Sequence, residues 1–301
     1  MRDGAKAIVI LYRPEAELLV AQFDRIREQV ETVLYYDNGG GRDALEDLGL
    51  LAETNVTLIG DGTNVGLARA LNLALDAAGP AGVALLLDQD SIPDPNLVDT
   101  LRRGFAAPHG SSRPVLAVGP AIVDELEGRA EEFTRLRLGR NRRITSAAGA
   151  ATEFFEVDFL ITSGTMVDLA RLPDAGWNDE SLFIDCVDFD WSFAATARGF
   201  ALLGTFATTL SHRRGDLIHR APGGLAIRVH SPARLYYMHR NRVRLYTRPY
   251  VPLAWKTHDF ARMIVKLALL TAFVPQRGAR LRAALRGIAD GLRQRGGVDG
   301  G

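Results

Sequence analysis

Residues 85–95 read LLLDQDSIPDP, in which three leucines run directly into Asp88, Gln89 and Asp90. Two carboxylates at the end of a buried strand repel each other, and their burial costs free energy unless a positive charge compensates it. One interpretation is a solvated turn, because Asp, Ser and Pro are common turn residues. The other is a cation site, since Mg²⁺ and Mn²⁺ both accept carboxylate and phosphate oxygens as ligands. The spacing alone does not decide between them.

The chain around this stretch alternates short apolar runs with helical patterns. We expect strands at residues 7–12, 30–37, 55–60 and 82–88, and helices at 14–29, 43–52 and 64–79. Such alternation predicts an α/β fold with a mostly parallel sheet flanked by helices. Ligands of these sheets bind beyond the carboxyl ends of the strands, where Asp37 and Asp88 both lie.

The pattern continues less regularly toward the C-terminus. We expect a helix from Pro95 to about residue 107, a strand at 115–119 and an irregular, charged segment at 120–150. Strands around Gly164, a helix at 185–199 and a strand at 200–212 follow. We divide the chain into a catalytic domain, residues 1–215, and a basic, mostly helical region, residues 216–301.

The composition is that of a globular protein, with 301 residues, 47% of them hydrophobic and 24% charged. A formal net charge of zero conceals two opposed parts: residues 1–212 hold 18 Lys and Arg against 32 Asp and Glu, whereas residues 213–301 hold 18 against 4. A basic segment of this kind indicates an anionic partner.

Cysteine usage and hydropathy limit the compartments in which the protein is expected. Cys186 is the single cysteine, which excludes an intramolecular disulfide and fits a reducing compartment. The N-terminus lacks the pattern of a secretory signal. The apolar run at residues 263–274 has 12 residues with a lysine inside, whereas a membrane span needs about 20. We therefore expect a cytoplasmic protein that does not cross a membrane.

Several further segments lie between residues 9 and 246: VILYRPE, VLYYDNGG, NVGLARALNLAL, FLITSGTMV, ESLFIDCVDFDWSFAATARGF, LSHRRGD and YYMHRNRVRLY. Together with LLLDQDSIPDP they resemble, in content and in order, the family 2 glycosyltransferases of GT-A fold, and within them the bacterial rhamnosyltransferases. Two positions depart from the family pattern. Arg13 stands where the family usually has Asn, and Asp190 stands where the rhamnosyl group usually has Glu.

The resemblance implies roles for the acidic residues. Asp88 and Asp90 would hold Mg²⁺ or Mn²⁺ at the diphosphate of a nucleotide sugar, with His212 as a further ligand or diphosphate contact. Asp188 takes the position of the catalytic base, with Asp190 as the alternative. Simpler readings stay open, because a lone histidine is often structural and carboxylates are favoured at a helix N-terminus by its dipole.

Other residues are expected to bind the nucleotide and the acceptor. Tyr12 would stack on the base unless it packs at the strand edge, and Asp37 would accept a hydrogen bond from the base unless it shapes the following turn. Asn64 and Gly66 belong to GDGTNVG, residues 60–66, which resembles an anion-binding loop at a helix N-terminus; Asn64 is also a good N-cap. Ser163–Gly164 would line the acceptor side. The spacing G-x-G-x-x-G is missing, which argues against a dehydrogenase.

These residues lead to one expected function and several alternatives. We expect an inverting, metal-dependent glycosyltransferase that moves L-rhamnose from dTDP-rhamnose to a glycan or lipid-linked acceptor in bacterial surface polysaccharide synthesis. UDP-galactofuranose is the rival donor, and a non-catalytic module that binds sugar nucleotides or glycans is the rival class.

The basic C-terminal region has its own alternatives. We expect its helices to contact the membrane surface, which would make the protein peripheral on the inner face of the plasma membrane. The alternatives are helices that simply pack on the catalytic core, or a homo-oligomer. Nucleic acid is the less favoured partner.

Overall fold

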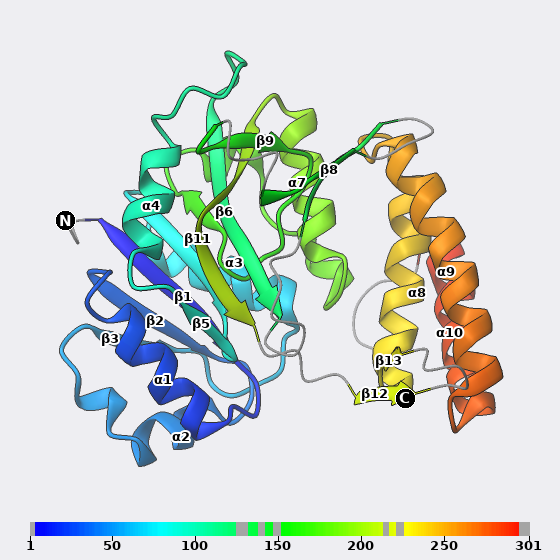
Figure 1. Cartoon of the computed structure of the whole chain (residues 1–301). Helices are drawn as coiled ribbons and strands as arrows, with labels where there is room; N and C mark the ends of the chain where they lie inside the picture. The colour runs from blue at the N-terminus through cyan, green and yellow to red at the C-terminus, as the bar shows by residue number, and fades with distance from the viewer. Residues whose placement is uncertain are drawn as a thin grey trace.

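The structure is a computed structural model of the chain and describes residues 4–124, 132–137, 142–146, 152–212, 217–220 and 226–294. Its centre is a mixed sheet of nine strands (Figure 1). In spatial order these are β3 (Val56–Ile59), β2 (Thr32–Asp37), β1 (Ala5–Leu11), β4 (Val83–Asp88), β10 (Met166–Asp168), β6 (Val115–Asp124), β11 (Ala201–His212) and β5 (Ser91–Pro93), with β9 (Phe155–Val157) also paired to β11.

The first half of the sheet is parallel and the second half is mixed. Strands β3, β2, β1 and β4 run parallel, as the sequence predicts. Strand β10 is antiparallel to both of its neighbours, β4 and β6, while β6 and β11 are parallel to each other. The predicted α/β class with a mostly parallel sheet is confirmed.

Helices cover both faces of the sheet because the strands are apolar on both sides. On β1, Ile8 points into one core with α3 (Leu67–Ala78) and α7 (Val187–Ala197). Its neighbours Ala7 and Val9 point into the other core with α1 (Ala16–Ile26) and α4 (Leu97–Gly104). This two-sided burial is typical of parallel sheets. Short helices α2 (Gly41–Asp47) and α6 (Leu172–Ala175) lie in the connections.

Several predicted boundaries are corrected by the structure. The helix predicted at 43–52 is α2 followed by a separate 3₁₀ turn, Leu50–Ala52, because Gly49 between them has a φ of 68°. The strand predicted at 115–119 continues to Asp124. The segment predicted as irregular also contains β7 (Phe133–Arg135) paired with β8 (Arg142–Ile144). Strand β5, directly after the DQD stretch, was not predicted.

The C-terminal region consists of helices α8 (Pro232–Thr247), α9 (Leu253–Phe273) and α10 (Arg277–Leu292), preceded by β12 (Leu217–Arg220) and β13 (Ala226–Val229). The three helices lie side by side (Figure 1). Gly287 of α10 packs so closely on α8 that a Cβ there would lie 2.3 Å from the Tyr236 carbonyl oxygen. No described helix is long and apolar enough to cross a membrane.

An aromatic cluster joins this region to the catalytic half. Trp255 of α9 lies 5.3 Å from Phe189 and 5.6 Å from Phe193, measured between ring centroids, and both phenylalanines belong to α7. Trp255 is buried in the same core as α3 and α7. The C-terminal helices therefore pack on the core that covers one face of the sheet through apolar contacts.

Candidate active site

The turn that carries Asp88 and Asp90 is held in place by two glutamines. Gln22, fully buried on α1, donates from Nε2 to the carbonyl oxygens of Asp88 and Ser91, each at 2.7 Å. Gln89 accepts from the Tyr12 backbone N–H at 2.8 Å and donates to the Tyr12 carbonyl at 3.0 Å. The DQD turn is thus tied to helix α1 and to the end of strand β1.

Strand pairing brings His212 to this turn. Strands β5 and β11 are antiparallel with His212 opposite Ser91, so the last residue of β11 lies beside the residue that follows Asp90. His212 Nδ1 is 2.9 Å from Ser91 Oγ and 3.5 Å from Asp90 Oδ1. Ligand atoms of Asp88, Asp90 and His212 all lie within 4.8 Å of one another. The structure therefore assembles the three residues predicted to bind a metal.

The electrostatics of this cluster suit a cation. Burial raises the pKa of Asp88 above its usual range, and the charge of Asp90 adds to the effect while His212 opposes it. Burial likewise raises the pKa of Asp90, again opposed by His212. Two carboxylate oxygens and an imidazole nitrogen are ligands that Mg²⁺ or Mn²⁺ accepts. The donor set therefore fits a divalent metal.

Arg234, in the first turn of α8, also acts on this cluster. Its positive charge opposes the rise in the pKa of both Asp88 and Asp90. Its guanidinium Nε and Nη2 each lie 3.4 Å from Asp185 Oδ1. The sequence analysis did not single out Arg234, because nothing in the sequence shows that α8 begins beside the DQD turn.

Asp188 lies in the first turn of α7, half-buried, on the wall of a pocket that also includes Thr162, Thr165 and Trp191. Burial raises the pKa of Asp188 to about 6, and the charges of Asp185 and Asp88 add to this rise. The Phe189 backbone N–H donates to Asp188 Oδ1 at 2.9 Å and opposes the rise. A carboxylate with a pKa near 6 is suited to accept a proton near neutral pH.

Asp190 has a different environment from Asp188. It is buried, accepts a hydrogen bond from the Tyr250 hydroxyl at 2.7 Å and forms an ion pair with Arg248. Both partners follow helix α8. These contacts indicate that Asp190 fastens α7 to the C-terminal region, so that Asp188 is the better-placed candidate for the base.

Helix α8 holds the loop that precedes Asp188. Asn241, fully buried, donates from Nδ2 to the carbonyl oxygens of Leu182, Ile184 and Asp185 at 2.8, 2.6 and 2.9 Å. Arg240, also buried, donates from Nη2 to Leu182 O at 2.9 Å. Both residues belong to the motif YYMHRNRVRLY, but nothing in that motif indicates that they face inward.

Tyr12 and Asp37 lie at the carboxyl ends of β1 and β2, where the nucleotide is expected. Tyr12 is 43% exposed, and the guanidinium carbon of Arg13 lies 5.3 Å from its ring centroid. Asp37 accepts hydrogen bonds from the backbone N–H groups of Gly39, Gly41 and Arg42 at 2.9, 2.8 and 2.9 Å. Although burial alone would raise the pKa of Asp37, these bonds hold it below its usual range. The turn role of Asp37 is thus shown, while its contact with a base stays a prediction.

The predicted N-cap at Asn64 is wrong. Helix α3 begins at Leu67, and its N-cap is Gly66, whose φ is 85°. Asn64 lies two residues earlier, where its Oδ1 accepts from the Gly66 backbone N–H at 3.0 Å and from Asn38 Nδ2 at 3.3 Å. A side chain at Gly66 would collide with Phe183, because a Cβ there would lie 2.3 Å from Phe183 Cδ2.

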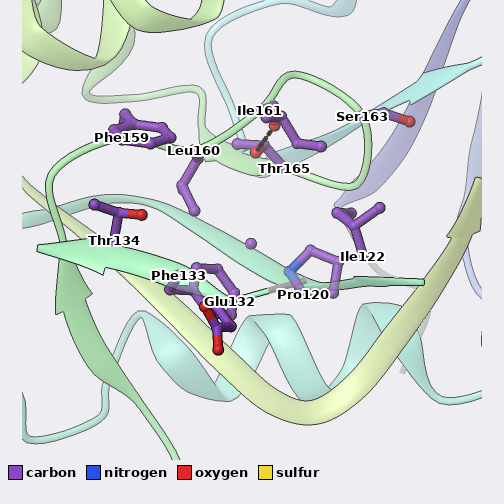
Figure 2. A pocket seen from close by; sticks show the side chains of 11 residues that line it. Pro120, Ile122, Glu132, Phe133, Thr134, Phe159, Leu160, Ile161, Ser163 and Thr165 are labelled. Carbon is purple, nitrogen blue, oxygen red and sulfur yellow. Dashed lines mark hydrogen bonds between the residues drawn. The ribbon is translucent and has the colours of Figure 1, made fainter. Parts of the chain in front are cut away.

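A second pocket is lined in part by the loop that carries Ser163 (Figure 2). Its wall is mostly apolar, with Phe133, Phe159 and Pro120, and Ser163 lies at its edge. Ser163 Oγ is 2.8 Å from Ser91 Oγ and accepts from the Asp88 N–H at 3.1 Å. Gly164 has a φ of 83°, and a Cβ there would lie 2.9 Å from Pro120 Cγ. The Ser163–Gly164 loop thus connects the DQD turn to this pocket; its role toward an acceptor stays a prediction.

Solved structures and curated proteins show what this arrangement is similar to. The chain matches GalNAc-T7, solved with UDP, GalNAc and Mn²⁺, at a TM-score of 0.59 and 15% identity over 96% of this chain and 56% of that one, so it spans just over half of GalNAc-T7. It matches S. aureus TarS 1-349, solved in complex with UDP-GlcNAc, at a TM-score of 0.57 and 15% identity over 97% of this chain and 81% of that one. The chain has the GT-A fold.

Sequence comparison identifies a relative that aligns with the whole of this chain. The chain is 26% identical over 306 aligned positions to dTDP-rhamnosyl transferase RfbF of Shigella flexneri, covering 100% of this chain and 98% of the relative. No family model matches the chain. The expected resemblance to rhamnosyltransferases of GT-A fold is confirmed, and the fold and the relative together support a glycosyltransferase.

Proposed function

We propose that the protein is an inverting, metal-dependent glycosyltransferase that transfers L-rhamnose from dTDP-rhamnose to a glycan or lipid-linked acceptor of bacterial surface polysaccharide. The observation that carries the proposal is the cluster of Asp88, Asp90 and His212 at the carboxyl end of β4, with Asp188 close enough for its pKa to respond to Asp88. The full-length similarity to a dTDP-rhamnosyl transferase supports the choice of donor.

In the proposed reaction Asp188 accepts the proton of an acceptor hydroxyl as that oxygen attacks the anomeric carbon of the donor. The bond between the anomeric carbon and the diphosphate breaks, and the nucleoside diphosphate leaves with the electron pair. A single displacement of this kind inverts the anomeric configuration. A divalent cation held by Asp88, Asp90 and His212 would stabilise the charge that develops on the leaving diphosphate. The Arg234 guanidinium, in the first turn of α8, would also stabilise the charge on the leaving diphosphate.

A donor panel tests the choice of nucleotide sugar. Thermal unfolding is followed with dTDP-rhamnose, UDP-galactofuranose or UDP-GlcNAc, each with Mg²⁺, with Mn²⁺ or with EDTA. A ligand that binds the native fold raises the unfolding temperature, so we expect a rise with dTDP-rhamnose that requires the cation. A rise with UDP-galactofuranose alone would keep the class of enzyme and discard rhamnose.

Asp188→Asn tests the catalytic role. We expect release of dTDP in the presence of an acceptor to fall by roughly 10²–10⁴-fold, while the thermal shift with donor is retained. Asp174→Asn is the matched control, since Asp174 is an exposed aspartate on α6. Full turnover in the Asp188 variant would reject the base assignment. Donor binding without turnover in the wild type, with every acceptor tried, would favour the non-catalytic module.

A further inference from the structure

Helix α9 presents an apolar stripe to solvent. Leu253, Phe260, Ile264 and Val265 are 61, 52, 49 and 58% exposed. The spacing places Leu253, Phe260 and Ile264 on one side of a helix with 3.6 residues per turn, and Val265 lies at the edge of that side. The opposite side of α9 carries the buried residues Trp255, Met263 and Leu270. The helix is therefore apolar on two sides, and the rest of the described chain covers only one of them.

Helix α10 repeats this arrangement. It buries Ala283, Ala284, Gly287 and Gly291, and the two glycines pack on the backbone of α8. Leu281 and Leu285 are exposed on its outer side. Of the twelve large hydrophobic residues exposed in the described part of the chain, eight lie between residues 253 and 292. Exposure on this scale in one region marks an interaction surface.

The exposed charges of α9 and α10 are of one sign. Every residue from 253 to 294 is described, and the exposed charged side chains among them are all arginines: Arg262, Arg277, Arg282, Arg286 and Arg293. The two aspartates of this segment are engaged. Asp259 accepts from the Tyr246 hydroxyl at 2.7 Å and from Arg242 Nε at 3.0 Å. Asp290 accepts from the Tyr236 hydroxyl at 3.1 Å, and its Oδ1 lies 3.7 Å from Arg293 Nη1.

We propose that the outer faces of α9 and α10 dock on the surface of an anionic lipid bilayer. The acyl boundary would take up the apolar stripes, and the lipid phosphates would pair with the exposed arginines of the two helices, which is how basic amphipathic helices bind membranes. A second copy of the chain would bring two arginine-rich rims together. An RNA would pair with the arginines but leave the aliphatic stripe in water. The bilayer alone matches both properties of the surface.

Vesicle co-sedimentation of the full chain tests the proposal without any need for enzyme activity, so its result does not depend on the proposed function. We expect binding to vesicles of phosphatidylcholine with phosphatidylglycerol, and at least about tenfold weaker binding to phosphatidylcholine alone. The double variant F260S/I264S should lose at least about tenfold in affinity for the anionic vesicles. Val20→Ser with Leu73→Ser is the matched control, because both residues are exposed apolar side chains on α1 and α3.

Three results would overturn the proposal. The first is no binding to anionic vesicles, and the second is equal binding by F260S/I264S and the wild type. The third is a wild-type dimer in light scattering that F260S/I264S converts to a monomer while vesicle binding is absent, since a second copy would then cover the stripe. Circular dichroism checks that each variant is folded. We expect all of them to fold, because the substituted side chains are exposed in the native chain.

Discussion

At the scale of single residues, Asp188 is held in a state that its surroundings disfavour. Burial raises its pKa to about 6, above the value near 3.9 of a free aspartate. Above pH 6 the folded protein carries this charge at a cost, whereas the unfolded chain carries it in water. The carboxylate therefore lowers the stability of the fold where it would act as a base.

We predict that Asp188→Asn stabilises the metal-free protein by up to about 3 kcal/mol at pH 7–8. Below about pH 4 the carboxyl is protonated in both states, so the difference between variant and wild type should vanish. Urea unfolding across this pH range measures the effect. A constant difference at all pH values would mean that the change acts through packing and not through ionisation.

Single residues also show where sequence reasoning succeeds. Asp88, Asp90 and His212 could be grouped from an ordered set of motifs, although 121 positions separate Ser91 from the histidine it contacts. Gln22 and Asn241 could not be found in this way. Their role depends on which backbone carbonyls lie within reach of one amide, and that is decided by the packing of α1 and α8. Asn64 shows the reverse error, since a good capping residue stands two positions before the cap.

At the scale of elements, the pairing of β5 with β11 brings His212 to Asp88 and Asp90. We predict that His212→Ala weakens Mn²⁺ binding in the presence of dTDP by about tenfold or more, since loss of even an indirect partner of a metal ligand costs about that much. Ser91→Ala, which removes the hydroxyl beside His212, should have a smaller effect. Isothermal titration with Mn²⁺ measures both, and the exposed His258→Ala is the control. Unchanged binding in His212→Ala would make His212 structural.

Helix α8 is the second element with a testable role. Asn241→Ala removes the donor shared by three carbonyls of the loop before Asp188. We predict a loss of about 1–3 kcal/mol in the free energy of unfolding, because buried carbonyls lose their partner. Turnover should fall as well, while Mn²⁺ binding at β4 and β11 is retained.

Urea unfolding, dTDP release and Mn²⁺ titration of Asn241→Ala separate these effects. Thr257→Ala, on the exposed side of α9, is the control. Normal turnover in a destabilised Asn241 variant would show that the loop keeps its shape without α8.

The strands were easier to predict than the helix limits. Runs such as VALLL, residues 83–87, are apolar along their whole length because both faces are buried, and such runs are easily recognised in a sequence. The helix limits depend on backbone angles at glycines. Gly49 and Gly66 both have a positive φ, so each one limits a helix although the hydrophobic spacing of the sequence continues across it. Strand β5 has three residues and exists only because β11 lies beside it.

At the scale of the whole molecule, the split of charge along the chain acquires a structural explanation. Several arginines of α8 and of the turn after it face the acidic part: Arg248 pairs with Asp179 and Asp190, and Arg244 donates to Ser181. Part of the basic excess is thus used inside the molecule. Composition favours an external partner and leaves packing on the rest of the chain as an alternative, because it does not show which helix packs where.

The packing of α10 on α8 yields a prediction at this scale. Alanine usually stabilises a helix relative to glycine by about 1 kcal/mol. Gly287→Ala should instead destabilise the protein by about 1–3 kcal/mol, because the new Cβ would overlap the Tyr236 carbonyl. Gly278→Ala, with no atom within 4 Å of its Cβ position, should show the usual gain. Thermal unfolding of both variants is the measurement; a gain in both would mean that α10 does not pack closely on α8.

Gln89, the middle residue of the DQD turn, behaves like a short piece of backbone. Its amide exchanges two hydrogen bonds with the Tyr12 peptide group, as neighbouring residues of two strands do. A glutamate there could accept but not donate, and would add a third negative charge beside Asp88 and Asp90. Motif notation treats this position as free to vary. In this protein the Gln89 side chain takes the place of a peptide group. Its two hydrogen bonds hold the turn that carries the carboxylates on either side.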